Sequence, residues 1–424
     1  MPVQSSTMKE NDENADVWDQ LSVILQKVVT FLIFIFPVFL VMVPDGKYVT
    51  VVLLLVSLVG LLLVRERVPL LDHERVFLYV FLFYFLVQLF NVWWFNAELR
   101  ELDTSSRFLI VLPIFFYLRK VDIDVKWLIN GVILAAIIIG FSALYDVFLM
   151  QTGRPTSQTD IGTYALFSAV YALMSLAATQ YYRDNRVMHY LSILAFLGGL
   201  SGVVLALTRG VWIAFVIAMI SFILINPFQW KRNSMRTFLL VMTALVAMIY
   251  LVPETGVAVR VDQAIQNGLA YFGEGVSSSS GGARLEMWKA AIEVIANNPV
   301  LGVGENNFNQ QVSLLIESKK IDGFVGQFNH PHNEYLSNLV EQGILGLVAL
   351  LALFLVPLKV YYTHLTEGTE ETRYLMLSGC FIIVLYMGFP VTSGVFYHQI
   401  GALFYTVMFS VIMGAYGAHV RSVS

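Results

Sequence analysis

Long apolar runs separated by short polar loops dominate the pattern of this chain. A membrane-spanning helix needs about 20 mostly apolar residues, and about twelve segments approach that length. The weakest is 104–118, because its apolar part FLIVLPIFFYL is short and contains Pro113, which leaves a re-entrant segment as the alternative. The expected segments are 21–43, 48–64, 76–94, 104–118, 127–150, 161–182, 188–207, 211–227, 237–253, 336–361, 374–391 and 399–418.

The composition narrows the class of protein. Of 424 residues, 57% are hydrophobic and only 13% are charged, against about 25% charged in soluble domains. This predicts an all-α polytopic membrane protein. The net charge of −4 is dispersed, which argues against a nucleic-acid partner. A single cysteine, Cys380, excludes an intramolecular disulfide and a cysteine-based metal site.

Basic residues indicate how the chain crosses the membrane, because Lys and Arg favour the cytoplasmic side of short loops. With the N-terminus inside and every segment crossing, the basic loops 65–75, 119–126, 183–186 and 231–236 are cytoplasmic. If 104–118 did not cross, the last two loops would move outside, so a full crossing is favoured. The N-terminal sequence lacks the basic start and cleavage site of a signal peptide, so the first apolar run is expected to be retained.

This topology divides the chain into four parts. Residues 1–20 form a cytoplasmic tail, 21–253 hold the first nine spans, 254–335 form one long outer loop, and 336–424 hold the last three spans and a short tail. The loop contains a Gly/Ser-rich stretch, 273–282. It is followed by ARLEMWKAAIEVIANNP, whose apolar residues recur at helical spacing. We expect amphipathic helices here that cap the membrane bundle.

Three arginines are expected on the outer face, where short loops should be poor in cations. Arg154 lies in QTGRPTSQTD, Arg209 in the tight turn LALTRGVWIAF, and Arg284 at the start of the amphipathic helix. For each arginine taken alone, contact with a lipid phosphate is about as probable as a role in a substrate site. Because guanidinium grips phosphate oxygens through two parallel hydrogen bonds, the group taken together predicts a lipid phosphate or pyrophosphate substrate.

The stretch GQFNHPHNEYLSNLVEQGILG places two histidines where the loop returns to the membrane. His330 is interpreted as structural. His332 lies at the mouth of the expected cavity, where a neutral imidazole can act as a general base. Asn333 and Glu334 could orient it, and Tyr335 is a further neighbour.

A metal-dependent reaction is disfavoured. A third ligand of clear spacing beside His330 and His332 is missing. The only D-x-D pair, Asp122 and Asp124, falls in a cytoplasmic loop. We therefore predict no metal and no cofactor. His398 is expected on the outer face and is assigned no role.

These motifs together resemble a known family. His332-Asn333, nine residues, then Gly343-x-x-Gly346 is similar to the H-N-x9-G-x-x-G pattern of O-antigen ligases (WaaL-type), in the O-antigen ligase/polymerase superfamily. LTRGVW resembles the family's short Arg-Gly-aromatic turn. GGARLEMWKAAIEVIANNPVLGVGENNF resembles its Arg-bearing helix followed by N-P-x-x-G-x-G. The resemblance covers about residues 200–346.

The resemblance implies a reaction and a cellular location for it. A glycan on undecaprenyl pyrophosphate would be transferred to a sugar hydroxyl of lipid A–core, at the periplasmic face of a bacterial inner membrane. Arg209 and Arg284 match the family's essential arginines and His332 its catalytic histidine; the match of Arg154 is looser. The expected mechanism is metal-independent and inverts the anomeric carbon, with the lipid tail in a groove between spans.

Several alternatives stay open. Within the superfamily, an O-antigen polymerase or a protein O-oligosaccharyltransferase differs only in the acceptor. In another class, about twelve spans also suit a transporter of lipid-linked glycans. A transporter should carry charges deep in the membrane, and the nearest candidate, Asp146, lies toward the outer end of its span. The oligomeric state is not determined.

Overall fold

The computed structural model describes residues 3–64, 67–225, 231–274, 280–321 and 323–423, and within these ranges the chain is helical without a β-strand. Short helical turns are η1 (Leu99–Leu102), η2 (Tyr145–Leu149), η3 (Pro253–Thr255), η4 (Gly323–Gln327) and η5 (Phe389–Val391). The α-helices are α1 (Val3–Met42), α2 (Tyr48–Leu63), α3 (Asp72–Trp94), α4 (Asp103–Ile110), α5 (Leu112–Leu118), α6 (Lys126–Leu144), α7 (Ile161–Tyr181), α8 (Arg186–Leu205), α9 (Arg209–Ile225), α10 (Arg232–Leu251), α11 (Val257–Glu274), α12 (Ser280–Asn297), α13 (Phe308–Glu317), α14 (Glu334–Thr363), α15 (Glu370–Gly388) and α16 (Gln399–Val423).

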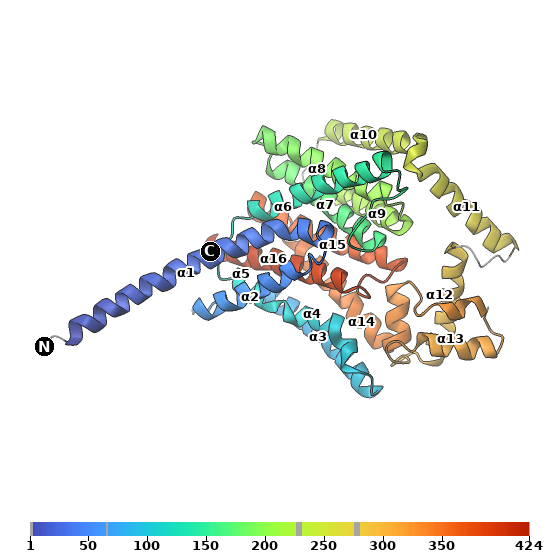
Figure 1. Ribbon diagram of the computed structural model, residues 1–424, viewed down its shortest axis with the longest axis horizontal. Coiled ribbons are helices and arrows are strands. Elements are labelled where there is room, and N and C mark those ends of the chain that lie inside the picture. The colour runs from blue at the N-terminus through green and yellow to red at the C-terminus, as the bar shows by residue number, and fades with distance from the viewer. Residues whose placement is uncertain (1–2, 65–66, 226–230, 275–279, 322, 424) are drawn as a thin grey trace.

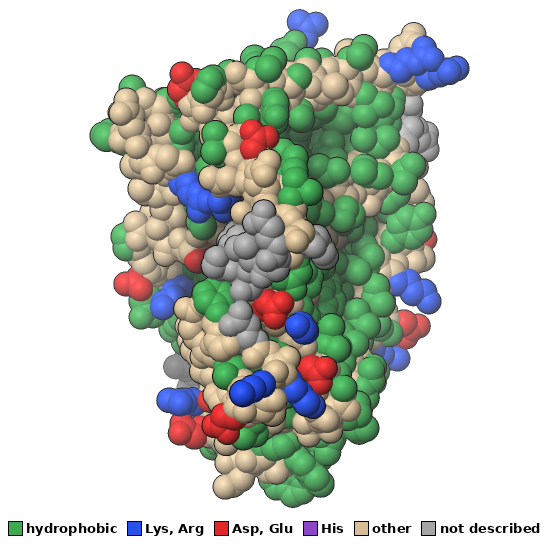
Figure 2. Space-filling view, turned by 90° about the vertical axis from the view of Figure 1, so that its right-hand side faces the viewer, with side chains coloured by type: hydrophobic (Ala, Val, Ile, Leu, Met, Phe, Trp, Pro, Cys, Tyr) green, Lys and Arg blue, Asp and Glu red, His purple; other side chains and the backbone are tan. Residues whose placement is uncertain are grey.

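The helices form one bundle with a cap at one end. Both chain termini lie on the same side of the bundle, and α11, α12 and α13 lie at the opposite end (Figure 1). Seen onto that capped end, the molecule is hollowed, and hydrophobic side chains line the hollow (Figure 2). The expected long loop is therefore a helical cap, as its amphipathic pattern predicted. Part of the Gly/Ser-rich stretch, 275–279, lies outside the described residues.

Membrane-spanning character is confirmed, while the number of spans stays a prediction. Within the described residues, eight helices are long and apolar enough to cross a bilayer: those at 20–42, 72–94, 126–149, 161–181, 186–205, 334–363, 370–391 and 399–422. Three shorter apolar helices, at 48–63, 209–225 and 235–251, coincide with further expected segments. The protein is thus a multi-pass membrane protein.

The expected segment 104–118 is interrupted. α4 ends at Ile110, and α5 restarts at Leu112, with Pro113 in its first turn, where a missing N–H costs nothing. Arg119, directly after α5, bonds Glu74 at the start of α3. The two short helices together therefore return along the whole length of α3.

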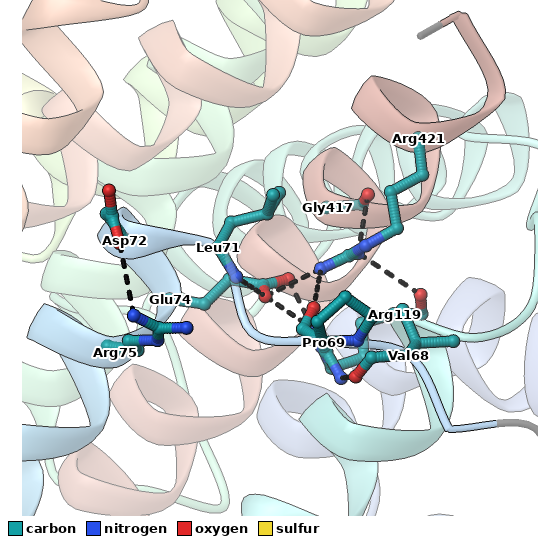
Figure 3. A network of polar contacts seen from close by, with 9 residues as sticks. All are labelled: Val68, Pro69, Leu71, Asp72, Glu74, Arg75, Arg119, Gly417 and Arg421. Atoms are coloured by element: carbon teal, nitrogen blue, oxygen red, sulfur yellow. Dashed lines mark hydrogen bonds and ion pairs between the residues drawn. The ribbon is translucent and has the colours of Figure 1, made fainter.

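A buried ion cluster fixes that meeting point at the end of the bundle near the C-terminus (Figure 3). The carboxylate of Glu74, fully buried, accepts from Arg119 at 2.8 Å and from Arg421 of α16 at 2.7 Å. It also accepts from the backbone N–H of Leu71 at 2.8 Å. Because both arginines further bond backbone carbonyls, the charges are compensated and three distant segments are joined.

The centre of the bundle is formed by α7, α15 and α16. In their apolar windows 89%, 78% and 94% of residues are buried, against half or less in the other five long helices. Close packing around this centre uses small residues. A Cβ on Gly140 of α6 would lie 2.4 Å from the Cα of Gly198 on α8. Such contacts bring helix backbones together, which substitutes in lipid for the missing hydrophobic force.

Candidate functional site

The histidine loop, residues 328–333, precedes α14 and holds two imidazoles side by side. The backbone N–H of His332 donates to Nδ1 of His330 at 3.1 Å, and the ring centroids are 4.0 Å apart. His332 has a φ of 50°, a left-handed conformation that few non-glycine residues adopt. Since an N–H donates to its Nδ1, His330 must be unprotonated there.

Both histidines are kept neutral by their surroundings. Burial, with smaller effects of His332 and His398, lowers the pKa of His330 to about 4. Burial, the guanidinium of Arg284 and His398 lower the pKa of His332. At pH 7 His332 is therefore a free base that can accept a proton. His398, to which the sequence assigned no role, lies within electrostatic range of both rings.

Arg284 reaches this loop because α12 is anchored to it. The indole N–H of Trp288, one helical turn after Arg284, donates to the carbonyl of Pro331 at 3.1 Å. Pro331 separates the two histidines, so this bond fixes the Arg284 face of α12 against His332. Burial and the charge of Arg209 lower the pKa of Arg284. Arg209 and Arg284, far apart in sequence, therefore lie within electrostatic range.

Arg209 is the first residue of α9, directly after a sharp turn. Leu207 in this turn has a φ of 55°. Gly210 packs so closely against η5 that a Cβ there would lie 1.9 Å from Oγ1 of Thr392. The indole of Trp212 donates back to Val203 of α8 at 2.9 Å. The Arg-Gly-x-Trp motif is thus a packing device that fixes where Arg209 emerges.

Arg154 belongs to the loop between η2 and α7, which Asp146 organises. One oxygen of Asp146 accepts from both the N–H and the hydroxyl of Thr156 at 2.7 Å. Thr152 donates to the carbonyls of Asp146 and Arg154 at 2.9 and 2.7 Å. Asp146 therefore structures the loop before α7, and its place at the end of the helix gives no support to a deep transport site.

A fourth arginine, Arg260 of α11, was missed by the sequence analysis. Burial and the charges of Arg154, Arg209 and Arg284 lower its pKa, so it lies within electrostatic range of all three. Its Nε donates to the carbonyl of Leu207 at 3.4 Å, which docks α11 on the turn before Arg209. The sequence did offer a signal, because Arg260 lies in the long loop, but the helical pattern identified there begins only at Ala283.

The four residues Arg154, Arg209, Arg260 and Arg284, called here the arginine cluster, collect positive charge, and Arg284 brings this charge within electrostatic range of His332. For Arg154, Arg260 and Arg284, the described part of the chain supplies no ion-paired carboxylate. Like charges brought together repel, and an anion bound among them relieves that cost.

The predicted neighbours of His332 have structural roles instead of direct bonds to its ring. Oδ1 of Asn333 caps α14 by accepting from the N–H groups of Tyr335 and Leu336 at 3.0 and 3.1 Å. The carboxylate of Glu334 accepts from the N–H of Phe396 at 3.2 Å. The hydroxyl of Tyr335 donates to Met387 at 2.7 Å. These bonds fix the start of α14, directly after His332, and an orienting role of Asn333 and Glu334 toward the imidazole stays a prediction.

α14 is broken at Gly343, which has φ 63° and ψ −154°. The segment 299–304 fits into the break and replaces the lost helical bonds. Ile344 donates to Pro299 at 3.0 Å, Val303 to Val340 at 2.8 Å, and Gly304 to Glu341 at 2.9 Å. The N-P-x-x-G-x-G and G-x-x-G motifs are thus two halves of one joint. It connects α12, which carries Arg284, to α14, which begins two residues after His332.

An apolar groove of about 410 Å³ opens beside the arginine cluster. It runs between α8, α9 and α10, and its lining includes Val257 and Val261 of α11, the helix that carries Arg260. Trp212, three residues after Arg209, lines the same groove. A cationic site and a hydrocarbon-lined groove therefore adjoin. Among the described residues, no three His, Cys, Asp or Glu side chains are grouped to hold a metal.

Comparison with known proteins covers the same region. Residues 193–351 match the model of a family described as O-antigen ligase. This segment contains Arg209, Arg260, Arg284, His332 and the break at Gly343. The matched segment supports membership of the O-antigen ligase superfamily.

A similar protein extends the likeness beyond the matched segment. An uncharacterized protein of Haemophilus influenzae is 24% identical over 386 residues, which cover 89% of this chain and 95% of that protein. The similarity therefore includes most of the helices before residue 193. Arg154 lies outside the segment matched by the family model.

Proposed function

We propose that this member of the O-antigen ligase superfamily transfers a glycan from undecaprenyl pyrophosphate to a sugar hydroxyl of lipid A–core, completing lipopolysaccharide. The observation that carries the proposal is the arginine cluster beside a neutral His332. Its cations come from four separate segments, and guanidinium is the side chain best suited to pyrophosphate. The family supports a glycosyltransferase-like enzyme, and the donor and acceptor are our inference.

The proposed reaction is a single displacement. The acceptor hydroxyl gives its proton to the imidazole of His332, and its oxygen forms a bond to the anomeric carbon. The bond from that carbon to the pyrophosphate breaks, and the electron pair leaves with undecaprenyl pyrophosphate. Arg209, Arg284, Arg154 and Arg260 stabilise the negative charge that develops there. Attack from the opposite face inverts the anomeric carbon, and the proton passes from His332 to solvent.

The polyprenyl chain of the donor would occupy the apolar groove between α8, α9 and α10. The groove is lined by hydrocarbon and reaches the arginine cluster at one end. This arrangement suits an amphiphile with a diphosphate head and a long tail. We further propose that the capped end faces the periplasm of a bacterial inner membrane, with twelve crossings and both termini in the cytoplasm. The basic loops at the opposite end support this orientation.

Alanine substitution of the arginine cluster tests the proposal. In purified protein given a fixed donor and lipid A–core, Arg209→Ala, Arg284→Ala and Arg260→Ala should each lower kcat about 10²–10³-fold, as removal of a charge contact made in the transition state does. His332→Ala should also abolish transfer. The matched control is Lys289→Ala, an exposed cation on the same helix as Arg284, which should keep wild-type rates.

The same assay separates the alternatives. A second lipid-linked glycan as acceptor detects a polymerase, and a Ser/Thr peptide detects a protein oligosaccharyltransferase. Normal lipopolysaccharide in cells that carry a well-inserted His332→Ala protein would contradict the general base. Movement of the donor across vesicles without any new glycosidic bond would favour a transporter.

A further inference from the structure

A second groove with a polar head lies outside the arginine cluster. A pocket of about 320 Å³ lies at the bundle's capped end between the α1–α2 turn, the start of α7 and the start of α16. It is lined by Asp45, Lys47, Asp160, His398 and Gln399, among others. These carboxylate, ammonium, imidazole and amide groups supply the mixture of donors and acceptors that sugar hydroxyls require.

An apolar channel continues from this polar pocket along the bundle. It also measures about 320 Å³ and runs between α2, α4 and α16. Lys47 and Gln399 line both spaces, so the two adjoin. Its walls include Val51 and Leu54 of the apolar helix α2 and Ile110 of α4, together with Asp103 and Arg107. A polar head beside a largely apolar channel is the shape of a site for a lipid-anchored saccharide.

The polar head is held in place by the fold. Asp45 has a φ of 54°, and a Cβ on Gly46 would lie 1.7 Å from the carbonyl of Phe39, so the turn that presents Lys47 is tightly packed. The amide of Gln399 donates to Asp103 at 2.6 Å, which Arg107 binds through both carboxylate oxygens at 2.9 and 3.0 Å.

Lys47 is a half-buried cation suited to an anionic head group. Its ammonium lies 5.7 Å from the ring centre of Tyr48, and no carboxylate of the described residues forms an ion pair with it. An ammonium at the boundary between polar pocket and apolar channel lies where a phosphate of a lipid-anchored saccharide would enter.

The pocket also borders the proposed reaction centre. His398 lines it, and its ring centre lies 6.1 Å from that of Tyr397, which in turn lies 4.5 Å from the ring centre of His330. The donor groove lies between α8, α9 and α10, so the two grooves use different helices. An amphiphile in this second groove could bring its saccharide toward the imidazole of His332 without competing for the arginine cluster.

We infer that the groove formed by α2, α4 and α16, with its polar pocket at Lys47 and His398, binds the acceptor, an anionic lipid-anchored saccharide. The inference rests on the proposed function for the reaction that the acceptor undergoes. The hydrocarbon chains lie along Val51 and Leu54, and the saccharide lies over Asp160 and Gln399. Lys47 neutralises an acidic group of the head.

Neighbouring residues of α2 give a matched pair of variants. Val51 and Val52 are 47% and 46% exposed, yet only Val51 lines the channel. With saturating donor, Val51→Trp should raise the KM for intact lipid A–core about tenfold and leave the donor KM unchanged, while Val52→Trp should match wild type. Lys47→Met should raise the KM for both intact and deacylated lipid A–core. Val51→Trp should leave the KM for deacylated lipid A–core unchanged.

A binding measurement separates failure of this inference from failure of the proposed function. The single native cysteine, Cys380, is buried, so a benzophenone probe can be attached at Val51→Cys or Val52→Cys. The Val51 probe should cross-link radiolabelled lipid A–core, with unlabelled lipid A–core but not phosphatidylglycerol competing, and the Val52 probe should not show this competition.

Each outcome has one meaning. If Val51→Trp and Lys47→Met still transfer glycan with an unchanged acceptor KM, and the Val51 probe gives no specific cross-link, the groove assignment is overturned. The proposed function then stands. A specific cross-link in a protein that transfers no glycan to any acceptor supports the groove and overturns the proposed reaction.

Discussion

At the residue scale, the site depends on one neutral imidazole near several fixed cations. Burial is the largest cause of the lowered pKa of His332, followed by Arg284. Each cause disfavours the protonated ring, so His332 is a free base at neutral pH and becomes charged only as the pH falls below its ordinary range. Activity that needs this base should therefore fall on the acidic side.

Removal of Arg284 should move this titration in a known direction. In Arg284→Gln the repulsion between guanidinium and imidazolium is lost, so the pKa of His332 should rise toward 6.5. NMR titration of histidine-labelled protein without substrate measures it, with His332→Gln to assign the signal. Lys289→Gln, on the same helix, should leave the pKa of His332 unchanged. If the pKa of His332 fell or stayed the same in Arg284→Gln, Arg284 and His332 would not be coupled as described.

At the element scale, the important feature is the joint between the break in α14 and the segment 299–304. The helical bonds lost at Gly343 are replaced by bonds to Pro299 and from Val303 and Gly304. Irregular backbone at membrane depth is tolerated where protein satisfies it. The joint ties the helix carrying Arg284 to the helix that begins beside His332, so their distance is set by backbone bonds.

Gly343→Ala should damage this joint. A Cβ there would lie 2.2 Å from the carbonyl oxygen of Val300, and the residue has a φ of +63°. The left-handed conformation costs about 1–2 kcal/mol and the overpacking about 1–3 kcal/mol more. Unfolding in mixed micelles, followed by circular dichroism, measures the loss.

Gly268→Ala is the matched control, because a Cβ on that helical glycine meets nothing within 4 Å. It should be neutral or slightly stabilising, since alanine favours a helix by about 1 kcal/mol. Equal stability of the two variants would contradict the importance of the joint.

At the scale of the whole molecule, different interactions hold the two ends of the bundle. Near the C-terminus, Glu74 is compensated by Arg119 and Arg421. At the capped end, three cations of the arginine cluster lack such partners among the described residues. One end is thus an internally neutralised clamp, and the other keeps positive charge available for a ligand.

Glu74→Gln should destabilise the protein without altering the site. The substitution leaves two arginines with an uncompensated charge, and breaking one partner of a buried pair costs about 3–5 kcal/mol. The measurement is unfolding in mixed micelles, with donor binding measured well below the unfolding transition and expected to be unchanged.

Asp72→Asn is the control for this substitution, since the Asp72 side chain is 98% exposed and pairs only with Arg75 among the described residues. It should lower the free energy of unfolding by about 1 kcal/mol at most. A Glu74→Gln protein as stable as Asp72→Asn would show that the clamp contributes nothing.

The sequence by itself determined the helical membrane architecture and pointed to the candidate residues of the site. Apolar length sets where helices can cross, because the bilayer core has a fixed thickness. The helix 280–297 followed from its periodicity, and Arg209, Arg284 and His332 stood out because charged or titratable groups at a membrane boundary need a partner. These inferences use only local pattern and the solvent that each residue meets.

Only the tertiary structure decided what depends on contacts between distant segments. The interruption at Val111, the break at Gly343, the addition of Arg260 to the cluster and the capping role of Asn333 each follow from neighbours that the local pattern does not specify. Gly343 adopts a left-handed conformation because residues 299–304 supply the missing hydrogen bonds. Arg260 reaches its neighbours because α11 docks on Leu207. Such pairings are satisfied across the fold, and hydrophobic periodicity carries no record of them.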